Sequence, residues 1–188
     1  MSSSDIETIR ETLLLLRVQT RDEGAFQELV THYERRLLYY IHRILGNGAD
    51  RSDVLQEIWL RVFLKIHTVR VPSAFRVWLY KIAHDVAVSH LRKVRRWEAV
   101  SLRNEDAVEV PESSDWNELK LLEHAEQVHA ALSYLSIAHR EVLTLRFLEE
   151  LELSEIAEVI GCSVGTVKSR LHYAKSEMRK LLEGDAHD

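Results

Sequence analysis

The chain has 188 residues, with 25 Lys and Arg against 30 Asp and Glu, and the net charge of −5 argues against a generic nucleic-acid coat. Its single cysteine, Cys162, excludes a disulfide framework and a cysteine-based zinc site. The start of the chain lacks a basic signal-peptide region and no apolar run approaches the length of a membrane span, so we expect a soluble, cytoplasmic protein.

Apolar residues recur at spacings of three and four along most of the chain, and Gly and Pro number only 6 and 2, which predicts an all-α fold. A first helix carries the apolar cluster 13–16, and a second ends at Gly46-Asn47-Gly48. The spacing predicts a third helix over about 50–66 and a fourth, after Pro72, over about 74–96.

The stretch that follows loses the helical period and is acidic, since residues 98–126 hold nine Asp or Glu against two Lys or Arg. With Pro111 in its middle, it indicates a linker. A helix over about 115–132 and the apolar run at 140–147 come next. We therefore predict two small helical domains, at 1–97 and 115–188, joined by an acidic linker at 98–114.

Residues 153–172, LSEIAEVIGCSVGTVKSRLH, have the spacing of two short helices that meet at a tight corner. Gly161 supplies the backbone freedom for the corner, and Ser163 can cap the second helix. Such pairs also occur in enzymes and bundles, where cations on a helix are only solvated. The outward face of the second helix nevertheless suits a major groove, and its candidate DNA contacts are Ser163, Thr166, Lys168, Ser169, Arg170, His172 and Lys175.

The fourth helix mixes aromatic and cationic side chains. Aromatics can stack on unpaired bases while cations follow the backbone, a combination typical of single-strand binding, although Phe75, Trp78 and Tyr80 can equally belong to the core. The helix ends in four cations within five residues, which indicates a phosphate clamp. The candidate contacts of this helix are Arg76, Trp78, Lys81, Asp85, Arg92, Lys93, Arg95 and Arg96.

The third helix has a polar face formed by Asp53, Gln56, Glu57 and Arg61. Its default interpretation is a solvated surface. Leu60 and Leu64 lie near these polar residues, however, and exposed leucines among charges indicate a protein partner.

The ten histidines are scattered along the chain without a spacing that would place two rings on one helical face as metal ligands. The sequence also has no zinc-protease motif, phosphate-binding glycine loop or nucleophile elbow. We expect no metal, no cofactor, no small-molecule substrate and no catalytic residue.

Taken together, these segments resemble the small sigma factors of the extracytoplasmic-function type. DEGAFQELVTHYERRL and DRSDVLQEIWLRVF (22–63) are similar to the polymerase-binding helices of that family. FRVWLYKIAHDVAVSHLRKVRR (75–96) is similar to its promoter-melting helix. The stretch REVLTLRFLEELELSEIAEVIGCSVGTVKSRLHYAKSEMRKLL (140–182) is similar to its carboxy-terminal promoter-reading domain.

The resemblance implies roles for the candidate residues. Asp53, Gln56 and Glu57, with Arg61 beside them, would face the clamp coiled coil of RNA polymerase. The helix around 78–96 would capture the unpaired minus-ten strand, and the helix that carries Lys168 and Arg170 would read the minus-thirty-five element. Many relatives are held inactive by an anti-sigma protein, which would be a further partner.

The chain differs from the usual family pattern at three places. Asp85 replaces an Asn on the promoter-melting helix. The usual Leu-Pro that opens the second domain is Leu135-Ser136. The usual Gly-Leu-Ser before the helix-turn-helix is Glu150-Leu151-Glu152, so we expect that helix to start differently, with Ser154 as its cap.

We therefore predict a factor that binds core RNA polymerase, directs it to specific promoters and assists strand opening. Two alternatives remain at this point. A stand-alone helix-turn-helix regulator would bind duplex DNA without polymerase. A sigma-like decoy would bind only an anti-sigma protein.

Overall fold

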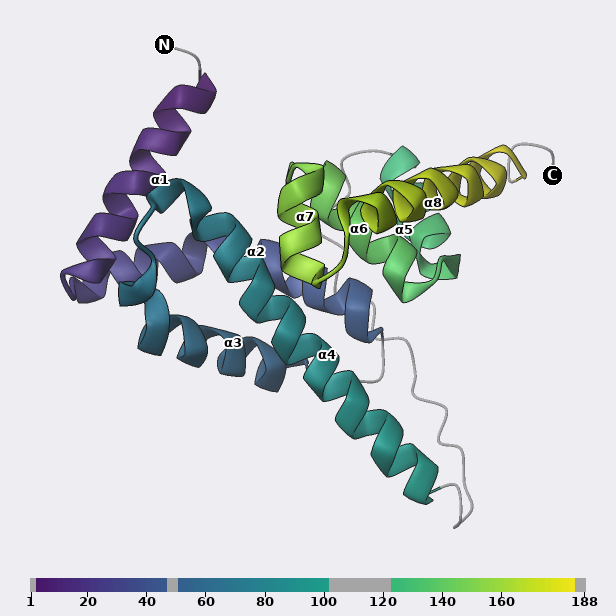
Figure 1. The fold of residues 1–188 in the computed structure, drawn as a ribbon, viewed down its shortest axis with the longest axis horizontal. Helices are drawn as coiled ribbons and strands as arrows, with labels where there is room; N and C mark the ends of the chain where they lie inside the picture. Colours follow the sequence, from purple (N-terminus) through teal and green to yellow (C-terminus); the bar gives the residue numbers. More distant parts are fainter. Residues whose placement is uncertain (1–2, 47–50, 102–122, 185–188) are drawn as a thin grey trace.

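The computed structural model describes residues 3–46, 51–101 and 123–184, and within them every regular element is helical (Figure 1). This confirms the predicted all-α fold of two small helical domains. The described residues of each domain form four α-helices. Their bounds are α1 Ser3–Gln19, α2 Glu23–Leu45, α3 Arg51–Lys65, α4 Phe75–Ser101, α5 Glu123–Tyr134, α6 Ile137–Phe147, α7 Leu153–Ile160 and α8 Val164–Gly184. Two short 3-10 helices, Ile66–Thr68 and Pro72–Ala74, lie between α3 and α4.

Local chemistry sets the ends of α2. The Asp22 side chain accepts a hydrogen bond from the Ala25 backbone N–H at 3.0 Å, which satisfies one of the unpaired donors of the first turn. At the other end Gly46 adopts a positive φ of 72° and its N–H donates to the His42 carbonyl. The helix therefore stops where the predicted glycine stop lies.

The core of the amino-terminal domain is built from the apolar stripes of α1 to α4. Tyr33, Tyr40 and Tyr80 are fully buried in it, and the rings of Tyr40 and Tyr80 meet edge to face with centroids 5.2 Å apart. Phe75 is buried as well. Phe75 and Tyr80 therefore pack in the core rather than forming a surface for stacked bases.

The α4 helix is the longest element and passes from this core into solvent (Figure 1). It continues to Ser101, through the start of the stretch that we predicted as linker. The predicted helix over 115–122 and the predicted linker residues after 101 lie outside the described residues.

The two domains pack against each other. The α6 helix lies on α2, and α7 lies on α4, so one continuous apolar cluster extends through both domains. The helix-turn-helix is thus held against the helix that carries the other predicted DNA contacts.

Candidate nucleic-acid interface

The corner of the helix-turn-helix has the geometry that its sequence predicts. Gly161 ends α7 in the left-handed region, with φ 66° and ψ 39°, and the Cys162 N–H donates to the Ala157 carbonyl at 3.1 Å. The Ser163 hydroxyl then accepts from the Thr166 N–H at 3.0 Å and caps α8. Ser163 is therefore engaged in the fold of the corner as well as being exposed.

The first helix of this motif does not begin as expected. Glu152, not Ser154, is the cap residue of α7, and its backbone N–H donates to the Glu155 carboxylate at 2.7 Å. A carboxylate three residues into the helix meets both an unpaired donor and the positive end of the helix dipole. Just before it, Glu150 has a φ of 55°, the left-handed conformation that the family's usual glycine adopts without strain.

The outward face of α8 holds most of the predicted major-groove contacts. Lys168, Ser169 and His172 are exposed, whereas Thr166 and Arg170 are half-buried. The Thr166 hydroxyl lies 2.8 Å from that of Ser163, so these two side chains form one polar group at the start of the helix.

The sequence-based prediction of DNA contacts included only some of the residues at the center of this outward face. The side chains of residues 167, 171, 174 and 178 form the buried stripe of α8. The residues two positions further along the chain lie about 200° around the helix axis, on the opposite side. That opposite side carries Ser169, Tyr173, Ser176 and Lys180. Tyr173 is 61% exposed, and the spacing alone is a signal that could have found it.

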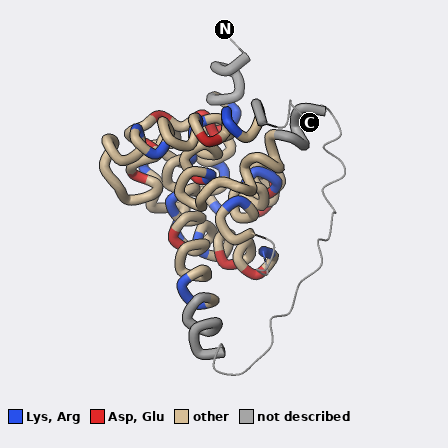
Figure 2. The backbone as a smooth tube through the Cα atoms, turned by 90° about the vertical axis from the view of Figure 1, so that its right-hand side faces the viewer, with Lys and Arg blue, Asp and Glu red and all other residues tan. Residues whose placement is uncertain are grey.

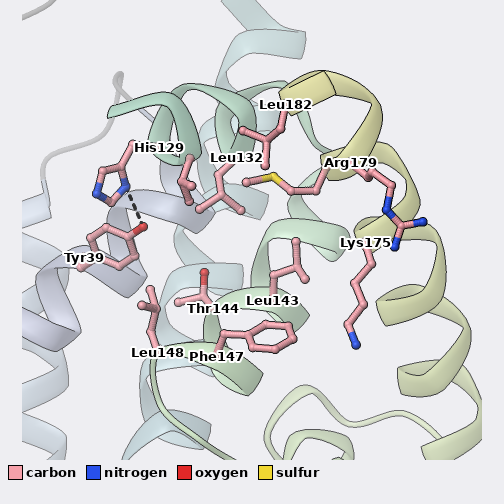
Figure 3. A pocket seen from close by; sticks show the side chains of 12 residues that line it. Tyr39, His129, Leu132, Leu143, Thr144, Phe147, Leu148, Lys175, Arg179 and Leu182 are labelled. Atoms are coloured by element: carbon pink, nitrogen blue, oxygen red, sulfur yellow. Dashed lines mark hydrogen bonds between the residues drawn. The ribbon is translucent and has the colours of Figure 1, made fainter. Parts of the chain in front are cut away.

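Lys175, a predicted DNA contact, lies to one side of this face. Its ammonium is 5.2 Å from the centroid of the Phe147 ring, a cation–π contact between α8 and α6. The side chain borders an apolar groove of about 730 Å³ rather than the center of the outward face (Figure 3).

This groove is a surface that the sequence did not reveal. Figure 3 shows Tyr39 and His129 at one side of it and Lys175 and Arg179 at the other. Phe147 and Leu148 are 56% and 46% exposed. Apart from Tyr39 of α2, the lining belongs to the carboxy-terminal domain: Val128, His129, Leu132, Leu143, Thr144, Phe147, Leu148, Lys175, Met178, Arg179 and Leu182.

The predicted contacts on α4 fall into two groups. Lys81, Asp85, Arg92 and Lys93 are exposed. Figure 2 shows Lys and Arg positions in blue along the part of the chain that the structure describes. The side chains of Arg95 and Arg96 lie outside the described residues.

Arg76 and Trp78, in contrast, are engaged inside the molecule. The Arg76 guanidinium donates to the Glu149 carbonyl of the other domain. Trp78 is half-buried, and its ring packs on Phe75 with centroids 5.9 Å apart and an interplanar angle of 35°. In this arrangement neither side chain is presented for stacking or phosphate contact.

The α3 face carries the predicted polymerase contacts. Asp53 and Gln56 are exposed, while Glu57 and Arg61 form an ion pair at 2.6 Å one helical turn apart. Toward the end of the helix the surface becomes apolar, because Leu60, Phe63 and Leu64 are each about 60% exposed. The face therefore joins a polar half to an exposed apolar half, as protein interfaces do.

Buried polar contacts join the two domains. Glu141 of α6 is only 5% exposed and accepts hydrogen bonds from the Tyr40 hydroxyl at 2.6 Å and from His84 Nδ1 at 2.7 Å. Burial, together with the nearby Glu141 carboxylate, raises the pKa of Tyr40 well above its usual value. Tyr40 is therefore a neutral donor to a buried carboxylate.

A second group of polar contacts lies at the edge of the groove. The Nδ1 atom of His129 is 2.7 Å from Arg43 and 3.0 Å from the Tyr39 hydroxyl, both of α2. Burial and the charge of Arg43 lower the pKa of His129. The ring is thus neutral, and its Nδ1 accepts a hydrogen bond from the Arg43 guanidinium.

Comparison with known protein families finds two separate matches in this chain. Residues 29–98 match Sigma-70 region 2, and residues 125–178 match Sigma-70, region 4. The RNA polymerase sigma-H factor of Pseudomonas aeruginosa is 34% identical over 182 residues, which cover 90% of this chain and 92% of that protein. The ECF RNA polymerase sigma-E factor of Escherichia coli K12 is 30% identical over 90% of this chain and 92% of its own length.

The chain belongs to the extracytoplasmic-function sigma factors. A further relative of this sigma factor is the ECF RNA polymerase sigma factor SigW of Bacillus subtilis, 28% identical over 88% of this chain and 93% of that protein. Family membership makes it a transcription initiation factor that directs RNA polymerase to promoters, as predicted from the sequence. Because both regions match, this function is favoured over a stand-alone regulator that uses the carboxy-terminal domain alone.

Solved structures show the same fold. The sigma factor RpoE in complex with the anti-sigma factor NepR from Bartonella quintana has a TM-score of 0.68 at 22% identity, covering 84% of this chain and 96% of that one. CnrH in complex with the cytosolic domain of CnrY has a TM-score of 0.61 at 21% identity, and the match covers 93% of this chain and 98% of that one. Within the residues that the structure describes, no helix is long and apolar enough to cross a membrane, and no group of three or more His, Cys, Asp or Glu side chains forms a metal-ion site.

Proposed function

We propose that this sigma factor contacts its promoter through two separate surfaces and core RNA polymerase through a third. The outward face of α8 reads the minus-thirty-five element in the major groove, with Thr166, Lys168, Ser169, Arg170, His172 and the additional Tyr173 in reach of base edges and phosphates. The observation that carries this assignment is the free outward face of α8 above a corner fixed by Gly161 and Ser163.

The projecting end of α4 captures the minus-ten strand. Arg92 and Lys93, with Arg95 and Arg96 beyond them, supply the phosphate contacts, and Lys81 and Asp85 lie on the same exposed helix. Asp85 accepts hydrogen bonds but donates none, so it favours bases that present an amino group. Binding of this kind weakens steeply as salt rises.

The α3 face binds core polymerase. Asp53, Gln56, Glu57 and Arg61 supply polar contacts, and Leu60, Phe63 and Leu64 supply the apolar area that a stable interface buries. The factor itself carries no catalytic residue. It acts in the cytoplasm, where the polymerase is.

An anti-sigma protein is proposed as a further partner, because two solved structures of the same fold are complexes with proteins of this kind or with a cytosolic partner domain. The apolar groove between α5, α6 and α8 offers it an open binding surface.

Run-off transcription tests the function. Core polymerase with this protein should yield a specific transcript from its own gene's upstream region or another candidate promoter, and core polymerase alone should not. A chain with Leu60 and Leu64 both replaced by Ser should lose transcript and co-migration with core polymerase, while a matched Leu13→Ser, Leu16→Ser chain, altered on the exposed face of α1, should keep both. A wild-type chain that never co-migrates with core polymerase would contradict the proposal.

A further inference from the structure

Three arginine side chains gather at the end of α2 and the starts of α3 and α6. Arg43 lies in the last turn of α2, Arg51 is the first residue of α3, and Arg140 lies in the first turn of α6. Arg43 is only 7% exposed, and Arg51 and Arg140 are half-buried. Cations held together away from water repel one another unless negative charge balances them.

The hydrogen bonds of two of these arginines go to neutral groups. The Arg43 guanidinium donates to Nδ1 of His129 at 2.7 Å and to the backbone carbonyl of the same residue at 3.3 Å. Arg51 donates to Nδ1 of His42 at 2.8 Å. Both imidazoles are neutral, because burial and nearby arginine charges lower the pKa of His42 to about 4 and also lower the pKa of His129. Neither ring supplies the negative charge that the arginines lack.

The third arginine, Arg140, makes no such contact. Its Nε and that of Arg43 are closed off from solvent without a hydrogen-bond partner among the described residues. Within the same part of the chain, no Asp or Glu side chain forms an ion pair with Arg43, Arg51 or Arg140. Burial, together with the charge of Arg43, lowers the pKa of Arg140. Buried donors are almost always paired in folded proteins, so two unpaired ones in a single cationic cluster indicate a binding site for an acceptor.

The starts of α3 and α6 add to the positive potential of this cluster. The amino end of a helix has unpaired N–H groups and the positive end of the helix dipole, which favour anions and disfavour cations. Arg51 and Arg140 nevertheless occupy the first turns of these two helices. The first turn of α6 has no acidic residue, and that of α3 has only Asp53, which is exposed. An anion between the two arginines would stabilise both helix ends.

A phosphate group suits this cluster better than a carboxylate does. Guanidinium groups bind phosphate oxygens through paired, charge-assisted hydrogen bonds. A phosphate group also carries a charge of about −1.5 to −2 near neutral pH, which balances more of the three positive charges than a single carboxylate can. Because Arg43 is 7% exposed, the ligand must be a small anion or the terminal group of a larger molecule.

We propose that Arg43, Arg51 and Arg140 form a binding site for a phosphorylated anion, either inorganic phosphate or the terminal phosphate of a nucleotide. His42 and His129 complete the site by holding two of the arginine side chains in place. None of these residues belongs to the two DNA surfaces or to the polymerase surface of the proposed function. The site therefore adds a small ligand to this sigma factor.

Isothermal titration calorimetry in chloride buffer at constant ionic strength tests the site with three probes: inorganic phosphate, ATP without magnesium, and acetate. The wild-type chain should bind phosphate or ATP at a single site and should not bind acetate, which carries one charge. Phosphate that binds as tightly as ATP would identify the free ion as the ligand. Binding of ATP about tenfold tighter than that of phosphate would identify a nucleotide.

Two variants remove charge from the site, and a third serves as their control. Arg140→Gln replaces the arginine that has no other contact, and Arg51→Gln replaces a second one. Each should weaken phosphate binding about tenfold, because a hydrogen bond between charged groups is lost. Arg35→Gln is the matched control, since it removes one exposed cation from α2 and should bind phosphate as wild type does.

Thermal melts separate a binding role from a structural one. Without phosphate, Arg140→Gln should melt at or above the temperature of wild type, because the substitution removes an uncompensated charge. Millimolar phosphate should raise the melting temperature of wild type and of Arg35→Gln, but not that of Arg140→Gln. An arginine with only a structural role would instead destabilise the chain when replaced, with and without phosphate.

Three results would overturn the site. One is a wild-type chain that binds neither phosphate nor ATP more tightly than acetate. Another is an unchanged phosphate affinity in Arg51→Gln and Arg140→Gln, which would place the anion elsewhere. The third is displacement of the anion by a DNA strand that lacks terminal phosphates, which would show that the arginines contact the nucleic-acid backbone. If Arg140→Gln loses its helical circular dichroism signal, the titration of Arg51→Gln decides.

Discussion

The two cation-bearing helices, α4 and α8, are similar in sequence character but differ in how the fold uses them. Along α4 the Arg76 side chain, near the domain interface, is engaged with Glu149, whereas Lys81, Asp85 and the cations further along the helix are exposed. Along α8 one stripe is buried and the opposite face is open over the whole described length. The difference shows that burial, and not residue type, separates a structural cation from one that can contact DNA.

The largest expected effect lies on the two faces of α8. Val167→Asp places a carboxylate at a fully buried position and should destabilise the carboxy-terminal domain by about 3 kcal/mol or more, with loss of transcription. Ser169→Asp, two residues on and exposed, should change the free energy of unfolding by less than about 0.5 kcal/mol. Urea unfolding followed by circular dichroism measures both. Equal destabilisation would contradict the assignment of the two faces.

The second-largest effect is expected from charge reversal at the projecting end of α4. The double variant Arg92→Glu, Lys93→Glu should weaken promoter binding by the holoenzyme about 10- to 100-fold at low salt and lower the salt slope by about two. The matched double variant Arg10→Glu, Arg70→Glu reverses two exposed cations elsewhere and should leave both quantities near wild type. Filter binding over a salt series measures the slopes. An unchanged salt dependence of binding in the α4 variant would contradict the assignment of this helix end as a phosphate clamp.

A smaller effect is expected from replacing Tyr173, at the center of the outward face of α8. Tyr173→Ala should weaken binding to an upstream-element duplex by about 1 kcal/mol, or roughly fivefold, because the ring supplies contact area at the groove. Tyr134 is 78% exposed on α5, and Tyr134→Ala should have no effect. Competition binding against a scrambled duplex measures the difference. If the two variants behave alike, Tyr173 does not touch DNA.

The amino-terminal domain should also lose stability in mild acid. Burial, together with the charges of Arg51 and Arg43, lowers the pKa of His42 to about 4, from a usual value of 6.5. The folded state therefore binds fewer protons than the unfolded state between these values, and stability is lost as pH falls from about 6.5 toward 4. We expect a loss of about 1 kcal/mol, because solvent screens a half-buried ring. Thermal melts across this range should show a flatter dependence for His42→Gln than for wild type, and parallel curves would contradict the assignment.

The smallest expected effect is a gain in stability beside α7. Glu150 holds a φ of 55°, so Glu150→Gly should relieve left-handed strain and raise stability by about 0.5 kcal/mol after the entropy cost of glycine. Glu150→Ala keeps the strain and should give no gain. Chemical denaturation of the three chains separates these outcomes, and a destabilised glycine variant would show that the backbone there is unstrained.

Much of this molecule follows from local sequence signals. Helix periodicity, the Gly46 stop, the Gly161 corner and the Ser163 cap are each determined by a few neighbouring residues, and all were predicted. The predicted cap residue of α7 was wrong, because Glu155 supplies an acceptor that competes with a Ser154 cap. The turn before it holds a non-glycine residue, Glu150, at positive φ.

The domain packing had no such signal. Glu141, Tyr40 and His84 lie on three helices far apart in sequence, and none of them has a neighbour whose spacing points to the others. Arg76 looks, in its local sequence, like any other cation on the promoter-melting helix. Only the meeting of α6 with α2 and of α7 with α4 separates it from Arg92 and Lys93.

The lone cysteine at the helix-turn-helix corner gives this sigma factor a natural reporter. Cys162 is half-buried, its thiol is free, and its Sγ lies 3.5 Å from the Ser163 carbonyl at the start of α8. Because the chain has one cysteine, a small maleimide dye attaches at a single known place without any engineered mutation. The fluorescence of the attached dye would report on the helix-turn-helix corner at each stage of transcription initiation.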